Sequence, residues 1–177
     1  LNLADSIVNK AHKSKHTNLE QFLGSYDCDS ISIKERIEQH ISIIGENISL
    51  KKFNKLSVVN KGKIISYLHQ KSSDHSGRIG VLVAIEGDIN NEIEKFGKHI
   101  AMHIAALKPL GLSIENIDQT IVDNERNILT EQVLKSKKPN NIIEKVIKGK
   151  MRKFFDQVVL LEQTFAIDGS TKIKKVI

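Results

Sequence analysis

The sequence predicts an α+β protein in which small three-stranded antiparallel sheets pack with helices and an antiparallel helical hairpin projects from them. The central observation is an unbroken run of β-favouring side chains at residues 81–85 (VLVAI), the pattern of a strand covered on both faces. Beyond Pro109 the pattern is helical throughout, which predicts the hairpin. Between the two lies a helical stripe able to cover the strand, formed by Ile93, Phe96, Ile100, Ile104 and Leu107.

The first part of the chain predicts helices. Residues 1–13 place apolar side chains four positions apart, which favours one amphipathic helix, and residues 19–23 add a short apolar patch. Ser32 followed by Glu35 is a capping box, which predicts a helix start because each side chain can accept a bond from the other residue's backbone N–H. Gly45 lies where a left-handed residue ends such a helix. The buried stripe of this helix is predicted to be Ile33, Ile37, Ile41 and Ile44.

Three antiparallel strands are predicted in the middle of the chain. Residues 48–59 are extended in pattern and end at a turn at residues 60–62. Residues 64–68 (IISYL) are predicted to return as the second strand. A polar loop at residues 70–77 then leads to the third strand, around residues 81–85.

The helical hairpin is predicted from two long amphipathic segments at residues 116–136 and 140–157, with Pro139 in the first turn of the second. The short link between them favours an antiparallel reversal. The residues predicted to face each other are Ile121, Ile128, Val133, Ile142, Val146 and Phe154. The apolar residues predicted to be left over are Ile143, Ile147, Met151 and Phe155. Such surplus surface favours docking on the body of the protein or on a second copy.

Composition limits the compartment and the partner. The 177 residues suffice for a core without disulfides, and the single cysteine, Cys28, suits a reducing compartment. No apolar run is long enough to cross a membrane, so we expect a soluble, cytoplasmic protein. The net charge of +6 favours an acidic partner, but 5% aromatic residues offer few rings for stacking RNA bases. The basic clusters, such as residues 148–153, are typical of solvated helix faces.

No enzyme active site is predicted. His12 with His16 and His99 with His103 have the helical spacing of a metal-binding pair, but neither has a third ligand nearby in sequence, so surface or interface histidines are the favoured interpretation. The phosphate-binding loop pattern and the nucleophile-elbow pattern are both absent. We therefore expect no catalytic residue, no metal and no cofactor.

Several motifs in order resemble one family. They are residues 44–48 (IGENI), 66–69 (SYLH), 78–84 (RIGVLVA), 98–109 (KHIAMHIAALKP), 149–154 (GKMRKF) and 159–165 (VLLEQTF). Together they resemble translation elongation factor Ts, the guanine-nucleotide exchange factor of elongation factor Tu, over nearly the whole chain.

The resemblance implies a domain organisation and an activity. Residues 1–87 would form an N-terminal core subdomain, residues 88–114 with 161–177 a second core subdomain, and residues 115–160 a coiled-coil hairpin. The factor would bind the GDP form of elongation factor Tu and promote GDP release without covalent chemistry. A homodimer through the hairpin is a further expectation, whereas membrane or direct nucleic-acid binding is not expected.

The resemblance also implies partner-contacting residues. They are Ile44, Gly45, His69, Ala166 and Ile167. Ile44 and Gly45 have an alternative structural role, in closing the helix stripe and the C-cap, and Ile167 has one in the core. His75 competes with His69 as the equivalent histidine.

The sequence departs from the family pattern in two respects, and two other functions are alternatives. The family carries an upstream three-helix domain and a Thr-Asp-Phe motif that are not in these residues, and the second subdomain lacks its closing helix and strands. We therefore expect the chain to fold in large part but to exchange nucleotide poorly. The alternative functions are a basic ribosome- or RNA-associated protein, recognised by steep salt dependence, and a scaffold that dimerises through its hairpin.

Overall fold

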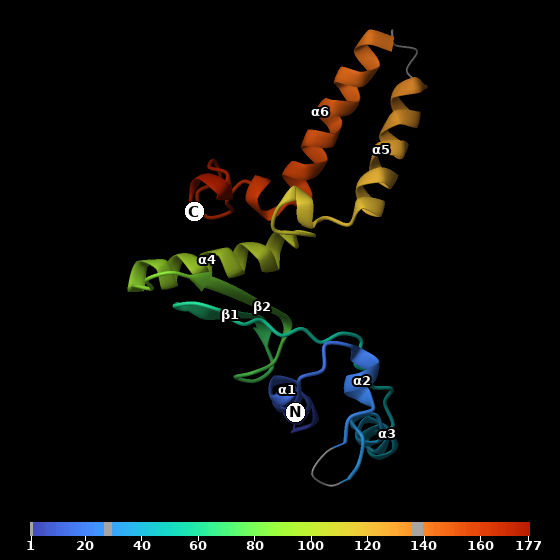
Figure 1. The fold of residues 1–177 in the computed structure, drawn as a ribbon, viewed down its shortest axis with the longest axis vertical. Coiled ribbons are helices and arrows are strands. Elements are labelled where there is room, and N and C mark those ends of the chain that lie inside the picture. The colour runs from blue at the N-terminus through green and yellow to red at the C-terminus, as the bar shows by residue number, and fades with distance from the viewer. Residues whose placement is uncertain (1, 27–29, 136–139) are drawn as a thin grey trace. The chain divides into compact units, whose positions relative to one another are not determined.

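A computed structural model describes residues 2–26, 30–135 and 140–177 (Figure 1). Cys28 and the predicted link at residues 136–139, with Pro139, lie outside the described residues. The elements in chain order are α1 (Asn2–Lys13), α2 (Leu19–Leu23), α3 (Ile33–Ile44), β1 (Gly62–Lys71), β2 (Gly77–Glu86), α4 (Asn91–Leu107), η1 (Ile114–Asn116), α5 (Gln119–Leu134), α6 (Asn140–Val158), η2 (Leu160–Glu162) and η3 (Ile173–Lys175). This mixture of helices with a small antiparallel sheet is compatible with the predicted α+β class.

The chain divides into two compact units. The first unit contains residues 1–64, 68–78 and 84–88. The second unit contains residues 65–67, 79–83 and 89–177. None of the helices that the structure describes is long and apolar enough to serve as a membrane span.

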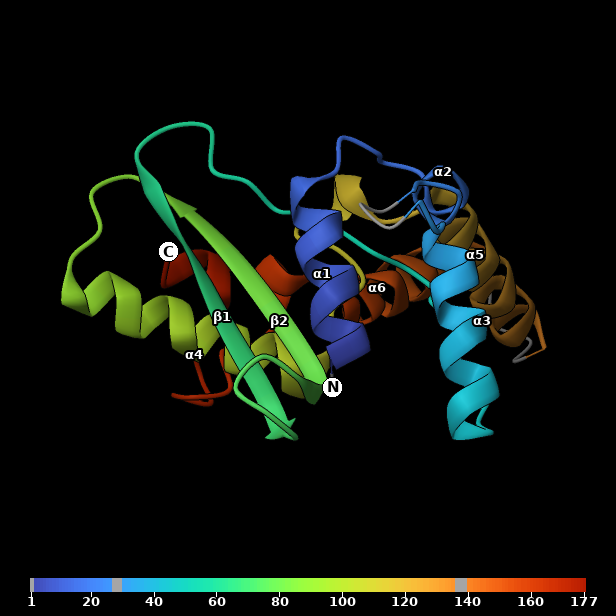
Figure 2. The ribbon, with the colours of Figure 1, turned by 90° about the horizontal axis from the view of Figure 1, so that it is seen from below.

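The first unit is built on α3, which packs against α1 and α2 (Figure 2). Phe22 and Ile33 are almost completely buried at its centre, and the Phe22 ring lies 4.7 Å from the ring of Phe53. The predicted capping box is confirmed, because the Ser32 N–H donates to Glu35 Oε2 at 2.8 Å and the Glu35 N–H donates to Ser32 Oγ at 3.1 Å. These bonds satisfy backbone donors that the first turn of α3 would otherwise leave open.

The sheet that the structure describes has two strands, so the prediction of a third strand at residues 48–59 is wrong. β1 and β2 lie side by side as a hairpin (Figure 2). Residues 48–59 run without a ladder partner, and Ile48, Leu50 and Phe53 pack into the helical core of the first unit. Three of its apolar side chains pack on helices and not in a sheet, whereas Leu56 and Val59 are exposed.

The second unit has two apolar clusters. In one, Ile100 of α4 packs with Val83 of β2 and with Phe165 and Ile173 near the C-terminal end, so a helix does cover the strand as predicted. In the other, residues at the base of α5 and α6 pack together: Ile117, Val122, Leu129, Met151 and Val159. Figure 1 shows α5 and α6 running side by side in opposite directions.

The predicted contact face of α5 and α6 is wrong by one position. Ile121, Ile128 and Ile142 were expected to face the other helix but are 40%, 51% and 43% exposed. Val122 and Leu129 on α5 are buried instead, together with Ile143 and Met151 on α6, which were predicted to be left over. Val133, which was predicted on the contact face, is buried as expected. Both stripes satisfy the helical period, and the packing of Val122, Leu129 and Met151 against Ile117 and Val159 at the base selects the second.

Replacing Gly62 with alanine tests how closely the start of β1 approaches the end of β2. A Cβ at Gly62 would collide with the Ile85 carbonyl oxygen and lie 2.9 Å from Glu86 Cα, so the strand ends would have to separate. We expect Gly62→Ala to lower the free energy of unfolding in urea by about 1–3 kcal/mol. Gly24→Ala is the control, because its Cβ would make an ordinary 3.5 Å contact with the Glu20 carbonyl oxygen. Equal stability of the two variants would contradict this packing.

Candidate functional site

The C-terminal end of α3 presents apolar side chains to solvent. Gly45 has a φ of 78°, and its N–H donates to the Ile41 carbonyl at 2.8 Å, which confirms the predicted left-handed C-cap. Ile44 was predicted to close the buried stripe, but its side chain is 55% exposed, and its neighbour Ile43 is 81% exposed. The stripe ends early because α3 extends past the core formed around Ile33. Its last turn therefore offers an apolar surface.

The two candidate histidines lie near the hairpin turn of the first unit. β1 extends beyond the predicted residues 64–68 as far as Lys71, so His69 lies within the strand. His75 lies in the loop between the strands, where its N–H donates to Ser73 Oγ at 3.3 Å. Both side chains are exposed, so both histidines remain candidates for partner contact.

Ala166 and Ile167 lie in a tight loop of the second unit. The Phe165 N–H donates to the Thr171 carbonyl at 2.7 Å, and the Gly169 N–H donates to the Phe165 carbonyl at 2.9 Å. Gly169 turns the chain with a φ of 69°, a backbone conformation that glycine adopts without steric cost. Phe165 is buried, whereas Ala166 is exposed and Ile167 is 51% exposed. We call residues 165–171 the Ile167 loop; its anchor is Phe165 and its exposed tip is Ile167.

A buried histidine anchors the Ile167 loop from α4. His103 is 1% exposed, and its Nδ1 accepts the Ala166 backbone N–H at 3.1 Å. Because an amide N–H only donates, Nδ1 carries no proton, and Nε2 is the ring donor to Gln163 Oε1 at 2.9 Å. The Gln163 side-chain amide in turn donates to the Gln157 carbonyl at 2.6 Å. A neutral histidine thus connects α4, the end of α6 and the loop by directional bonds.

Ion pairs connect the segments that precede and follow the Ile167 loop. Lys172 Nζ donates to Asp156 Oδ1 at 2.6 Å and to Glu162 Oε2 at 2.9 Å, and Lys174 Nζ donates to Glu162 Oε1 at 2.6 Å. The bonds from Lys174 and then Lys172 lower the pKa of Glu162, and the bonds to Asp156 and Glu162 raise the pKa of Lys172. These pairs join η2, η3 and the end of α6.

Asp168 shapes the loop itself. Its Oδ1 accepts the Ser170 N–H at 2.8 Å and the Thr171 N–H at 2.9 Å. These two backbone bonds favour the ionised carboxylate and lower the pKa of Asp168. The bonds hold the turn that follows Ile167, so the exposed isoleucine is carried on an ordered backbone.

The two predicted histidine pairs differ in how the structure places them. α1 ends at Lys13, so His12 and His16 do not share a helix, contrary to the predicted pair. His103 is a buried structural residue rather than a surface histidine, so that interpretation is corrected. No group of three His, Cys, Asp or Glu side chains that could hold a metal ion is found among the described residues.

The role of His103 could have been found from helical spacing. It lies three positions after Ile100 and seven after Phe96, on the same stripe of α4 that covers the core. Its partners Gln163 and Ala166 are sixty or more residues away in sequence, so the hydrogen bonds themselves had no local signal.

Comparison with known proteins gives a consistent family assignment. The family model described as Elongation factor TS matches residues 1–177. The chain is 39% identical over 163 residues to "Elongation factor Ts" of Orientia tsutsugamushi (strain Boryong), covering 92% of this chain and 53% of the relative. It is 38% identical over 174 residues to "Elongation factor Ts" of Bartonella tribocorum, covering 98% of this chain and 55% of that relative. "Elongation factor Ts" of Ehrlichia canis is 38% identical over 173 residues, with coverages of 97% and 60%.

Removing the His103 ring tests its anchoring role. In His103→Leu the part-buried Ala166 N–H and the buried Gln163 Oε1 lose their partner, and leaving the buried oxygen unsatisfied alone costs about 1–3 kcal/mol. We expect the free energy of unfolding in urea to fall by at least ~2 kcal/mol and the Ala166 amide hydrogen to exchange faster with solvent. His99→Leu on the same helix is the control and should change stability by less than about 1 kcal/mol. A parent-like exchange rate at Ala166 in His103→Leu would refute the anchor.

Acid should weaken the fold through Glu162 and Asp168. Their folded pKa values are lowered, so the unfolded chain binds more protons, and stability is lost as pH falls through the folded pKa values, below about 4. We expect the urea midpoint to fall over this range. In Asp168→Asn the midpoint should be lower than in the parent at pH 7, and the difference should shrink toward zero in strong acid. A difference that is independent of pH would contradict a contribution from the ionised carboxylate.

Proposed function

Because the chain belongs to the elongation factor Ts family, we propose that it binds elongation factor Tu in the GDP form and promotes GDP release during translation elongation in the cytoplasm. The observation that carries the proposal is the family match over residues 1–177. The chain spans only 53% to 60% of the lengths of these three relatives. The exchange activity of this chain is therefore a proposal.

Exposed isoleucines support a protein partner. Ile44 precedes a left-handed glycine, Gly45, and Ile167 lies two residues before another, Gly169. Each isoleucine is about half exposed on a backbone held by hydrogen bonds. Apolar side chains presented in this way can anchor a protein interface, because burying one removes apolar surface from water without ordering a loose segment.

The proposed mechanism is a change in binding equilibrium without covalent chemistry. In this proposal Ile44, Gly45 and His69 contact elongation factor Tu from the first unit, and Ala166 and Ile167 contact it from the second. Binding that favours the nucleotide-free partner weakens GDP binding by the same factor by which GDP weakens binding of this chain. No catalytic residue or cofactor is part of the proposal.

The proposed contacts are assigned to the domains expected from the sequence. Residues 1–87 would form the first contact subdomain and residues 88–114 with 161–177 the second. Residues 115–160, which contain all of α5 and α6, would form a projecting coiled coil. A homodimer through this hairpin remains a separate proposal, testable by sedimentation.

Capture of elongation factor Tu tests the proposed contacts. Immobilised chain should retain GDP-loaded elongation factor Tu, and excess free GDP should reduce the amount retained because the two binding events are coupled. We expect Ile44→Ser combined with Ile167→Ser to weaken capture at least about tenfold, since each anchor contributes ~1.5 kcal/mol or more on burial. Val59→Ser is the control, because Val59 is 85% exposed and is not a proposed contact. Undiminished capture by the double variant would reject these anchors.

The rate of GDP release tests the activity itself. We expect this chain to accelerate release of labelled GDP from elongation factor Tu less than a full-length relative does, because it spans little more than half of such a relative. Acceleration equal to that of the full-length protein would contradict the expectation that the remaining part of the family's sequence is needed.

A further inference from the structure

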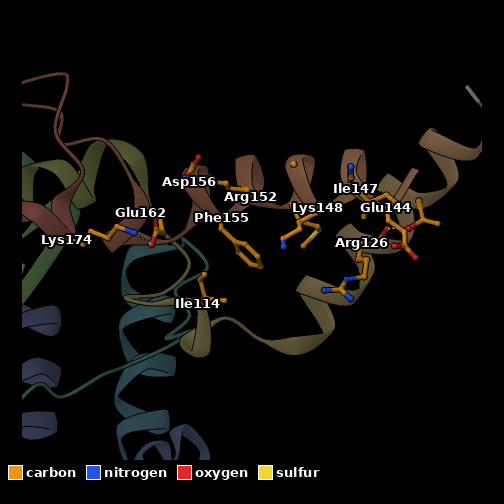
Figure 3. A pocket seen from close by; sticks show the side chains of 14 residues that line it. Ile114, Arg126, Glu144, Ile147, Lys148, Arg152, Phe155, Asp156, Glu162 and Lys174 are labelled. Carbon is orange, nitrogen blue, oxygen red and sulfur yellow. Dashed lines mark hydrogen bonds and ion pairs between the residues drawn. The ribbon is translucent and has the colours of Figure 1, made fainter. Parts of the chain in front are cut away.

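The second unit carries an open groove along α6 that the proposed exchange contacts do not use. The groove has a volume of about 1000 Å³ and runs along α6 from Glu144 to Asp156 (Figure 3). At 1.5 Å per residue this is roughly 18 Å, about three turns of a helix. Its apolar lining includes Ile147, Met151 and Phe155. This is the size and character of a groove that accepts one amphipathic helix.

The groove has an excess of positive charge. The acidic residues at one end, Asp156 and Glu162, are already paired with Lys172 and Lys174. Four exposed cations line the rest and form no ion pair with another described residue, against one further exposed carboxylate, Glu144: they are Arg126, Lys145, Lys148 and Arg152. An acidic ligand would therefore meet cations that intrachain carboxylates have not neutralised.

Gly149 leaves an open position on this face of α6. It lies inside α6 and lines the groove, where glycine is less favourable than alanine by about 1 kcal/mol. A Cβ at this position would meet no atom of the chain within 4 Å, so intrachain packing does not require the glycine. Its absent side chain leaves room for the backbone of a bound segment beside α6.

We propose that this groove binds an acidic amphipathic helix of a partner protein. Its apolar face would lie against the partly buried Ile147 and Phe155 and the small exposed edge of Met151, whose side chain is 5% exposed, and its carboxylates would meet Arg126, Lys148 and Arg152. The lining disfavours RNA, because Phe155 is the one aromatic ring among the described residues that form it and RNA bases need aromatic surfaces on which to stack. A second copy of this chain is disfavoured because it brings the same net charge of +6.

The two methionines allow a direct test of the location. The probe is a fluorescein-labelled peptide of about four helical turns, with leucines three and four positions apart on one face and glutamates elsewhere. Met151 lies in the groove, whereas Met102 is on α4 outside it, so methyl-labelled methionine gives one reporter and one internal control. We expect saturable binding that shifts the Met151 methyl signal and leaves the Met102 signal unchanged. A shift of Met102 alone, or no binding, would overturn the proposal.

Two variants test the charge and the space. Lys148→Glu with Arg152→Glu should weaken peptide binding at least tenfold. Lys51→Glu with Lys52→Glu makes the same change of net charge in the first unit and should change binding less than threefold. Gly149→Gln should weaken binding about tenfold while the circular dichroism spectrum stays parental, because a Cβ at this position meets no atom of the chain within 4 Å and the longer side chain would fill the groove.

Three further outcomes would reject the proposed occupant. Equal binding of a scrambled peptide, whose leucines no longer share a face, would show that charge alone attracts the probe. Tighter binding of a single-stranded RNA of equal charge would indicate a nucleic-acid surface. A homodimer that Lys148→Glu with Arg152→Glu dissociates would assign the groove to a second copy. None of these experiments uses elongation factor Tu, so their failure leaves the proposed exchange function untouched.

Discussion

The second unit depends on one buried histidine whose two ring nitrogens are both hydrogen-bonded. His103 accepts from the Ala166 backbone and donates to Gln163, and Gln163 continues the chain of bonds to the end of α6. A buried polar group is tolerable only when its partners are all present, so this arrangement specifies one position of the Ile167 loop relative to α4. Packing of Phe165 with Ile100 buries apolar surface, while the hydrogen bonds of His103 fix the orientation of the loop.

The two proposed contact segments use the same local device. Each has an exposed isoleucine one or two residues before a glycine in the left-handed region, Gly45 in the first unit and Gly169 in the second. A folded chain normally gains by burying isoleucine, so an ordered backbone that keeps it outside favours an interface over a loose loop. The groove on α6 differs from these segments, because its apolar lining is accompanied by exposed cations such as Lys148 and Arg152.

Helix ends were predictable from short sequence motifs. The packing partners of apolar segments were not, because they depend on residues distant in the sequence. Ser32, Glu35 and Gly45 encode their caps within a few residues, so α3 was predicted at both ends. The extended pattern at residues 48–59 did not reveal that its apolar side chains would pack on helices. The sequence alone also could not choose between the Val122 and Ile121 stripes, which have the same period. Among the candidate site residues, Gly45 was predictable from its cap, whereas the partners of His103 are distant in sequence.

Hydrogen–deuterium exchange with and without GDP-loaded elongation factor Tu tests the central claim most directly. In the free chain the Ala166 amide should exchange slowly, because its N–H is held by buried His103, while the amide of exposed Ile167 should exchange faster. Binding of the partner should add protection at residues 166–168 and 43–45 together. Fast exchange of Ala166 in the free chain, or added protection confined to other segments, would contradict an ordered loop that presents Ile167 to a protein partner.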